Sequence, residues 1–382
     1  MNEKCDYFIQ KKCRSCGLLA LPEAERTLHK EQKLKKDVRE VLGEGITIAP
    51  FWQPKKIFPS RSKAKLSVAG TVKEPVIGLV DLSLESTELL DCPLHLPQLN
   101  ELLHFIKTRI VEHKIAPYHI KRQQGELKSL ILKSNDSGSE VIVRFVLRSQ
   151  DALSKVKKAA RETQKQFSFV KVVSVNIQPL PAAILEGEEE IFLTENKTIW
   201  ESLGKYKMAF HPQSFAQVTP ETTGALYRHV VETLKKASVR SMLDLFCGVG
   251  GFSIAAADTL KWGHGVELSS QAVECANLSC VENKIDNLKF ETADVEKFIE
   301  IYAGPVPDAV LVNPPRRGIS SSIIDRVKTL GPRVIVYSSC NPTTLLRDLK
   351  LLSPQYSVKN LSPFDMFPLT EHLEVVAFLE KS

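Results

Sequence analysis

The chain has 382 residues, and 43% of them are hydrophobic, which is enough to bury more than one core. No run of about 18 or more apolar residues occurs, so the sequence predicts no transmembrane helix. The first residues lack the apolar stretch of a secretory signal. We therefore expect a cytoplasmic protein without a membrane partner, and nothing in the sequence indicates an obligate protein partner.

The net charge of +6 is distributed unevenly. Residues 1–65 contain 15 Lys and Arg against 8 Asp and Glu, a balance of +7, which leaves 36 against 37, or −1, for the rest. A localised basic region is typical of proteins that bind polyanions. The stretch HKEQKLKKDVRE also carries acids at helical spacing, so a solvated helix surface explains the charge equally well.

The first half of the chain predicts an α+β arrangement with antiparallel hairpins. The predicted elements are a helix at 22–42, a hairpin at 64–82, a helix at 97–113, a hairpin at 125–149, a helix at 152–167 and strands at 171–178 and 182–194.

The second half alternates short apolar runs with helical stretches. The runs are SMLDLF (241–246), HGVEL (264–268), DAVLVN (308–313) and RVIVYSS (333–339). Such alternation predicts a parallel, doubly wound sheet. We divide the chain into a cysteine-rich basic domain (1–95), a central α+β domain (96–214) and a catalytic domain (215–382).

The segment from Asp244 to Phe252 predicts a strand end, a glycine turn and a helix start. Glycines such as Gly248 let the backbone approach a ligand closely. The D-x-x-x-G-x-G spacing favours S-adenosylmethionine, because the G-x-G-x-x-G spacing of dinucleotide sites is absent. Glu267, at the end of the next apolar run, is placed to accept hydrogen bonds from ribose hydroxyls, although a surface acid would look the same.

The sequence Asn313-Pro314-Pro315-Arg316 ends the third apolar run. A polar residue and two prolines at a strand end predict a rigid turn facing the cofactor crevice. An ordinary strand-ending loop is the alternative. The same NPP sequence occurs in methyltransferases that act on amino groups, but Arg316 stands where those enzymes have an aromatic residue.

Cys340 lies in a polar turn just after the fourth apolar run. Most free cysteines are inert core residues, and we expect this of Cys247, Cys275 and Cys280. A thiolate at the active edge of the sheet could add to C6 of a uracil, which would make C5 nucleophilic toward a methyl donor. Removal of the C5 proton then needs a base, and Glu374, a charge at the start of an apolar strand, is the candidate.

The segments DLFCGVGGF, NPPRRG, YSSCNP and FDMFP…HLE together resemble the RNA uracil-C5 methyltransferases, and most of all the bacterial members that act on 23S rRNA. The resemblance implies a class I S-adenosylmethionine-dependent methyltransferase fold with an N-terminal α+β iron–sulfur and RNA-binding domain. It implies that Cys340 is the nucleophile and Glu374 the base. The cofactor contacts that we expect are Gln217, Phe246, Gly248, Glu267 and Asn313.

Four early cysteines, Cys5, Cys13, Cys16 and Cys92, have the pattern C-x7-C-x2-C…C. Four thiolates can ligate zinc or an iron–sulfur cluster, and the residues alone do not choose between them. The family resemblance implies a [4Fe–4S] cluster, with a role in structure or RNA binding.

RNA binding fits the basic N-terminal region, in which Arg61, Lys63 and Lys65 would hold phosphates. The target uracil must leave its stack to reach Cys340, so a loop nucleotide is expected. Two other hypotheses stay open: the same chemistry on tRNA, and a non-catalytic iron–sulfur RNA-binding protein. Replacing Cys340 with alanine separates an enzyme from a binder.

Overall fold

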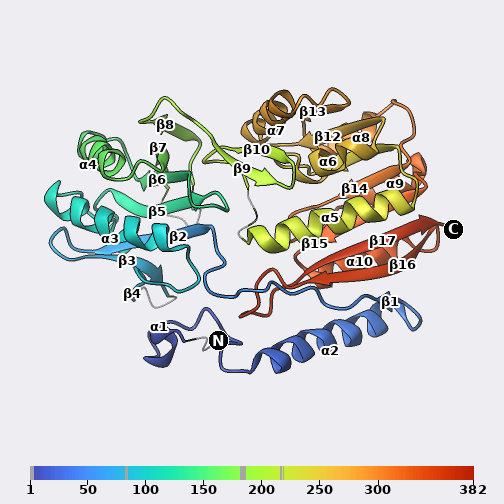
Figure 1. Cartoon of the computed structure of the whole chain (residues 1–382), viewed down its shortest axis with the longest axis horizontal. Coiled ribbons are helices and arrows are strands. Elements are labelled where there is room, and N and C mark those ends of the chain that lie inside the picture. The colour runs from blue at the N-terminus through green and yellow to red at the C-terminus, as the bar shows by residue number, and fades with distance from the viewer. Residues whose placement is uncertain (1–3, 82–84, 181–185, 216, 218) are drawn as a thin grey trace. The chain divides into compact units, whose positions relative to one another are not determined.

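The computed structural model describes residues 4–81, 85–180, 186–215, 217 and 219–382 (Figure 1). The chain forms two compact units. Unit 1 comprises Met1–Arg14, Lys56–Glu201 and Phe210–Pro212, and unit 2 comprises Ser15–Lys55, Ser202–Ala209 and Gln213–Ser382. This division differs from the boundaries at 95 and 214, because residues 15–55 supply a helix and a strand to the catalytic unit.

Unit 1 is built on one seven-stranded sheet with the order β4-β3-β2-β5-β6-β7-β8. Neighbouring strands are antiparallel except for β6 and β7, which are parallel. Its elements are α1 (Asp6–Ile9), β2 (Lys63–Gly70), β3 (Pro75–Val80), β4 (Ser86–Glu88), α3 (Pro97–Glu112), β5 (Leu127–Ser134), β6 (Val141–Leu147), α4 (Leu153–Gln166), β7 (Val170–Ile177) and β8 (Glu189–Phe192).

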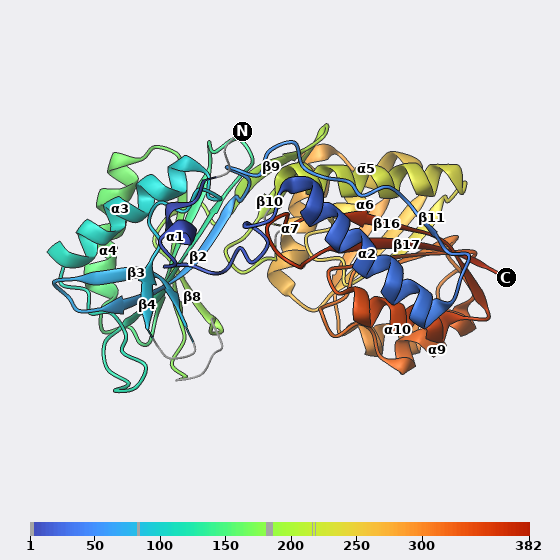
Figure 2. The same ribbon diagram turned by 90° about the horizontal axis from the view of Figure 1, so that it is seen from below.

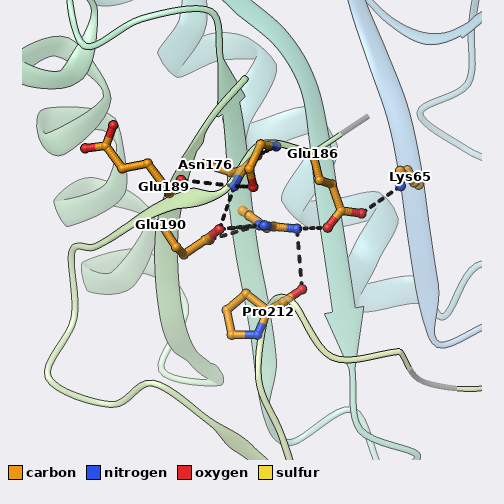
Figure 3. A network of polar contacts seen from close by, with 8 residues as sticks. Lys65, Asn176, Glu186, Glu189, Glu190 and Pro212 are labelled. Carbon is orange, nitrogen blue, oxygen red and sulfur yellow. Dashed lines mark hydrogen bonds and ion pairs between the residues drawn. The ribbon is translucent and has the colours of Figure 1, made fainter. Parts of the chain in front are cut away.

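The two faces of this sheet differ in chemistry. Ala64, Leu66 and Val68 alternate along β2 and join the core that α3 and α4 cover. The opposite face carries polar side chains, among them the buried Arg144, and Figure 3 labels the residues of the polar network to which it belongs. Its guanidinium binds Glu186 and, at 2.9 Å from Nε, Glu190.

One of the cations expected to hold phosphates belongs to this network. Lys65 donates to Glu186 Oε1 at 2.9 Å, on the same carboxylate that Arg144 binds (Figure 3). The neighbouring Lys63 has its pKa lowered to about 8 by burial. The basic residues of β2 are therefore partly engaged within unit 1.

Unit 2 contains an eight-stranded sheet with the order β1-β16-β17-β15-β14-β11-β12-β13. The strands are parallel except for β17, which is antiparallel to both of its neighbours. Its elements are α2 (Glu23–Leu42), β1 (Thr47–Ile48), α5 (Pro220–Lys236), β11 (Ser241–Leu245), α6 (Gly251–Ala256), η1 (Ala257–Thr259), β12 (Trp262–Glu267), α7 (Ser270–Asn283), β13 (Leu288–Thr292), α8 (Val295–Ile301), β14 (Ala309–Val312), α9 (Ser321–Leu330), β15 (Val334–Ser339), α10 (Pro342–Leu352), β16 (Tyr356–Phe364) and β17 (Glu374–Lys381). A separate two-stranded sheet pairs β9 (Ile199–Leu203) with β10 (Tyr206–Phe210).

Helices cover both faces of this sheet, which confirms the predicted doubly wound arrangement. Leu243 and Val310 pack in the core beneath α2, α8, α9 and α10, and Met242 and Leu311 pack in the core beneath α5 and α6. Alternate residues of each central strand thus enter opposite cores, as a sheet buried on both faces requires. In the described part of the chain, no helix is long and apolar enough to cross a membrane.

Helix α2 packs against α10, although α2 ends at Leu42 and α10 begins only at Pro342 (Figure 2). Leu34 and Val38 of α2 lie in the core of unit 2. The outer face of the helix carries ion pairs between neighbouring turns, such as Lys35 with Glu31. A solvated, self-paired surface therefore accounts for part of the N-terminal basic stretch.

Candidate active site

Four of the predicted site residues lie at one edge of the unit 2 sheet. Phe246, Asn313 and Cys340 directly follow β11, β14 and β15, and Glu267 is the last residue of β12. These strands are adjacent and parallel, so their carboxyl ends meet at this edge. The Asn313 N–H donates to the carbonyl of Leu245 at 3.2 Å and continues the pairing to the end of the strands.

The glycine turn after β11 is open toward this edge. Phe246, Gly248 and Gly250 all have positive φ angles, of 64°, 55° and 78°, and a Cβ at Gly248 would meet no atom within 4 Å. The Gly248 N–H donates to Glu267 Oε2 at 3.2 Å, and the Ser269 N–H donates to Oε1 at 2.9 Å. Two backbone amides thus fix the Glu267 carboxylate beside an open turn.

Asp244 anchors the turn from beneath. Its side chain is fully buried and accepts a hydrogen bond from Ser253 Oγ at 2.6 Å. Burial raises the pKa of Asp244 to about 7. The bond ties the end of β11 to α6, and the sequence offered no reason to single out Ser253 as its partner.

Cys340 is half-buried in the turn between β15 and α10. Burial raises the pKa of its thiol and nearby Glu374 raises it further, while the Arg316 guanidinium beside it lowers the pKa. The thiol lines a pocket of about 280 Å³. The other lining residues are Lys30, Lys33, Leu34, Asp37, Arg316, Asn341, Pro342, Thr343, Glu371, His372 and Leu373.

Glu374 begins β17, where its neighbour Val375 pairs with Ser339 of β15. Its side chain is 2% exposed and accepts a hydrogen bond from Ser338 Oγ at 2.5 Å. Burial raises the pKa of Glu374 to about 7. The structure therefore brings the predicted nucleophile and the predicted base together, with the base titrating near neutral pH.

Arg316 links the turn after β14 to the turn that contains Cys340. Its carbonyl accepts hydrogen bonds from Asn341 Nδ2 at 2.9 Å and Thr344 Oγ1 at 3.1 Å. Its guanidinium approaches the His372 ring, 3.2 Å from Nδ1, as well as Cys340. Sequence reasoning used Arg316 only to exclude another methyltransferase class. A cation at a strand end on the same edge as a nucleophilic cysteine is the signal that could have assigned it.

Comparison with known proteins decides the family. Residues 188–382 match the model of a family described as tRNA (Uracil-5-)-methyltransferase. The chain belongs to this family. Its core is therefore that of an S-adenosylmethionine-dependent methyltransferase, and the doubly wound sheet of unit 2 agrees with this.

The whole chain of this methyltransferase resembles full-length relatives. It is 38% identical over 382 residues to the 23S rRNA (uracil(747)-C(5))-methyltransferase RlmC of Shewanella amazonensis, covering 99% of this chain and 97% of that protein. The RlmC of Escherichia coli is 37% identical over 378 residues, covering 99% and 100%. The crystal structure of Pyrococcus abyssi tRNA (uracil-54, C5)-methyltransferase in complex with S-adenosyl-L-homocysteine matches with a TM-score of 0.79 and 28% identity, over 95% of this chain and 85% of that one.

The glycine turn of the methyltransferase fits S-adenosylmethionine. Open space lies above Gly248, and the Glu267 carboxylate is held at the adjacent strand end, where hydroxyl groups can donate to its free lone pairs. Gln217 lies half-buried in the segment leading into α5. The individual roles of Gln217, Phe246, Gly248, Glu267 and Asn313 toward the methyl donor stay predictions.

The cysteines of the methyltransferase fall into two groups. Cys247, Cys275 and Cys280 are buried, in agreement with a packing role. Cys5, Cys13, Cys16 and Cys92 are half-buried.

Three of the early cysteines lie near one another within unit 1. Burial raises the pKa of Cys92, and the nearby thiols of Cys5 and Cys13 raise it further. Cys16 belongs to the segment Ser15–Lys55 of unit 2. Among the described residues, no group of three or more Cys, His, Asp or Glu has an arrangement that could hold a metal ion. The structure therefore does not support the expected iron–sulfur site.

Proposed function

We propose that this enzyme transfers a methyl group from S-adenosylmethionine to C5 of a uridine in 23S rRNA, with Cys340 as nucleophile and Glu374 as base. The observation that carries the proposal is a buried carboxyl group with a pKa of about 7 beside a half-buried thiol that lines a pocket. Two relatives of 37% and 38% identity over nearly the whole chain are named as 23S rRNA uracil-C5 methyltransferases, which favours this substrate over tRNA.

The chemistry begins at Cys340. Its thiolate, favoured by the Arg316 guanidinium, forms a bond to C6 of the uracil, and the electron pair of the 5,6 double bond moves toward C5 and the C4 carbonyl. S-adenosylmethionine supplies the methyl group from its sulfonium. C5 forms a bond to this methyl group while the sulfur–methyl bond breaks, which leaves S-adenosylhomocysteine. The Glu374 carboxylate then removes the C5 proton, the double bond re-forms and the C6–sulfur bond breaks, which regenerates the thiolate.

Labelled S-adenosylmethionine and purified RNAs test this proposal. Unmodified 23S rRNA should gain 5-methyluridine, and bulk tRNA should not. Cys340→Ala should abolish the product while the protein still binds S-adenosylmethionine. Glu374→Gln should accumulate RNA covalently bound to the protein, because elimination needs the base. Cys280→Ala, which removes a buried thiol of α7, is the matched control and should stay active.

The outcomes separate the substrate from the chemistry. Product in tRNA alone would retain the roles of Cys340 and Glu374 and overturn the 23S rRNA assignment. If neither RNA gains 5-methyluridine while S-adenosylmethionine binds, both roles are wrong. RNA binding with no methylation of any RNA would favour a non-catalytic RNA-binding protein.

We also propose that Cys5, Cys13, Cys16 and Cys92 ligate a [4Fe–4S] cluster. The proximity of Cys5 and Cys13 to Cys92 supports this, as does the two-residue spacing between Cys13 and Cys16. Anaerobic purification should yield iron and acid-labile sulfide, both lost in Cys92→Ser. If the protein contains zinc and no iron, the four cysteines form a zinc site. If it contains neither metal, the proposed metal site is wrong.

A further inference from the structure

The loop between β16 and β17 leads directly into the proposed base. It begins at Asp365, which follows Phe364, the residue paired with Glu374 across the two strands. It ends at Leu373, immediately before Glu374. Both ends of the loop therefore lie next to Glu374, one through the strand pair and one through the chain.

A single ammonium group from helix α2 binds both ends of this loop. Lys30 Nζ donates to Asp365 Oδ1 at 2.7 Å, to the Phe367 carbonyl at 3.0 Å and, more weakly, to the His372 carbonyl at 3.5 Å. The side chains of Lys30 and Asp365 are 2% and 4% exposed. An ammonium has three donors, and all three are directed at this loop.

The same loop reaches the nucleophile through His372. The His372 ring lies 3.2 Å from the Arg316 guanidinium, which in turn lowers the pKa of the Cys340 thiol. Next to it, Glu371 forms a hydrogen bond with His29 at 3.0 Å and an ion pair with Lys33 at 3.4 Å, and both partners belong to α2. Consecutive turns of α2 thus contact residues 371 and 372, which come shortly before Glu374 and include the partner of Arg316.

We infer that Lys30 is a positioning residue for methyl transfer: its buried contacts with Asp365 and the loop carbonyls set the places of Glu374 and of the His372–Arg316 pair beside Cys340. This inference rests on the proposed roles of Cys340 and Glu374. It gives α2, a helix from the N-terminal part of the chain, a function in the active site. The charge pattern of α2 did not suggest such a function.

A purely structural role explains the Lys30–Asp365 pair less well. Burial lowers the pKa of Lys30 and raises the pKa of Asp365, so the surroundings disfavour both charges. Apolar side chains of similar volume generally stabilise a protein as well as a buried ion pair does. What this pair adds to packing is a fixed geometry for the loop, because each donor binds a different point on it.

Two variants test the inference together. Lys30→Met alone removes the ammonium group that donates a hydrogen bond to the buried Asp365 carboxylate, and it should lower the melting temperature. Lys30→Met with Asp365→Asn removes both charges and should melt above the single variant. At a temperature at which it is fully folded, the double variant should bind S-adenosylmethionine as the wild type does, with kcat for 5-methyluridine formation at least tenfold lower. Covalent RNA–protein complex should accumulate, because the displaced Glu374 slows elimination.

Lys35→Met is the matched control. Lys35 is an exposed lysine of the same helix that pairs with Glu31, and its loss should leave melting temperature, kcat and covalent complex unchanged. A folded double variant with wild-type kcat and no accumulated complex would overturn the inference.

Hydrogen exchange separates this inference from the proposed function. If the wild type makes no 5-methyluridine in any RNA, the proposed function fails, but the anchoring of the loop can still be measured. Amides of residues 365–374 should exchange faster in the double variant than in Lys35→Met. Equal exchange would show that Lys30 does not hold the loop, whatever the activity.

Discussion

At the scale of single residues, the proposed role of Glu374 as the base depends on the pH at which its carboxyl group loses its proton. Its pKa of about 7 results from burial, and the hydrogen bond from Ser338 opposes that rise. A general base works only when it is deprotonated. We expect the elimination step, measured as the rate at which the covalent RNA–protein complex decays, to accelerate as pH rises through about 7.

The Ser338 hydroxyl gives a direct test of this titration. Ser338→Ala removes the hydrogen bond that lowers the pKa of Glu374, so the rising limb of the pH–rate profile should move to higher pH. Ser357→Ala, which alters a hydroxyl of β16 that bonds to the carbonyl of Glu380, should leave the limb in place. A Ser338→Ala profile that coincides with the wild type would show that another group sets the limb.

The same titration has a cost in stability. The pKa of Glu374 is higher in the folded than in the unfolded protein, so protonation of Glu374 stabilises the fold. This contribution to the free energy of unfolding is complete below about pH 4.5 and is lost as pH rises through about 7. Glu374→Gln carries no such charge, so it should be the more stable protein at pH 8, by on the order of 3 kcal/mol at most. Near pH 5 the advantage should shrink.

Urea unfolding at both pH values measures this difference. Asp244, whose pKa is also about 7, titrates in both proteins and cancels from the comparison. A stability difference between Glu374→Gln and the wild type that is the same at pH 5 and pH 8 would contradict the assigned protonation of Glu374.

At the scale of elements, α2 completes the catalytic unit. Leu34 is 3% exposed and packs in the core beneath the sheet, whereas Leu28 of the same helix is 51% exposed. Leu34→Ala should lower the free energy of unfolding by about 2–5 kcal/mol, through lost burial and the cavity left behind. Leu28→Ala should change it by less than about 0.5 kcal/mol. Equal effects in urea unfolding would mean that α2 is not held by this core.

The sequence predicted the positions of these helices and strands better than it predicted which of them pack against one another. Helical spacing predicted α2, but periodicity does not say which core the apolar residues of a helix enter, so α2 was assigned to a separate N-terminal domain. Lys30 illustrates the same limit, because nothing in HKEQKLKK distinguishes the buried lysine from the exposed ones.

The candidate site was predictable where local sequence carries the chemistry. Cys340, Glu374 and the glycine turn stand at strand ends in recognisable segments. Ser338 and Arg316 act through partners that are distant in sequence, and their contacts arise only from strand order and register. Such contacts cannot be read from spacing along one chain.

At the scale of the whole molecule, the catalytic unit is discontinuous in sequence. Residues 15–55 belong to it together with 202–209 and 213–382, while most of the chain between them forms the other unit. Within the catalytic unit, β1 is an edge strand that pairs with β16, and Leu34 and Val38 close the core over α10. A fragment that starts at residue 202 therefore lacks one strand and one covering helix.

This discontinuity predicts how fragments behave. Residues 202–382 alone should expose apolar surface and lack a cooperative thermal transition, because nothing replaces α2 over the sheet. Joining residues 15–55 to 202–382 through a flexible Gly/Ser linker restores those contacts and should restore a cooperative transition. Binding of S-adenosyl-L-homocysteine, followed by calorimetry, should return with it. If the fragment without α2 melts cooperatively and binds as tightly as the full chain, the N-terminal helix is dispensable and the anchoring role of Lys30 fails with it.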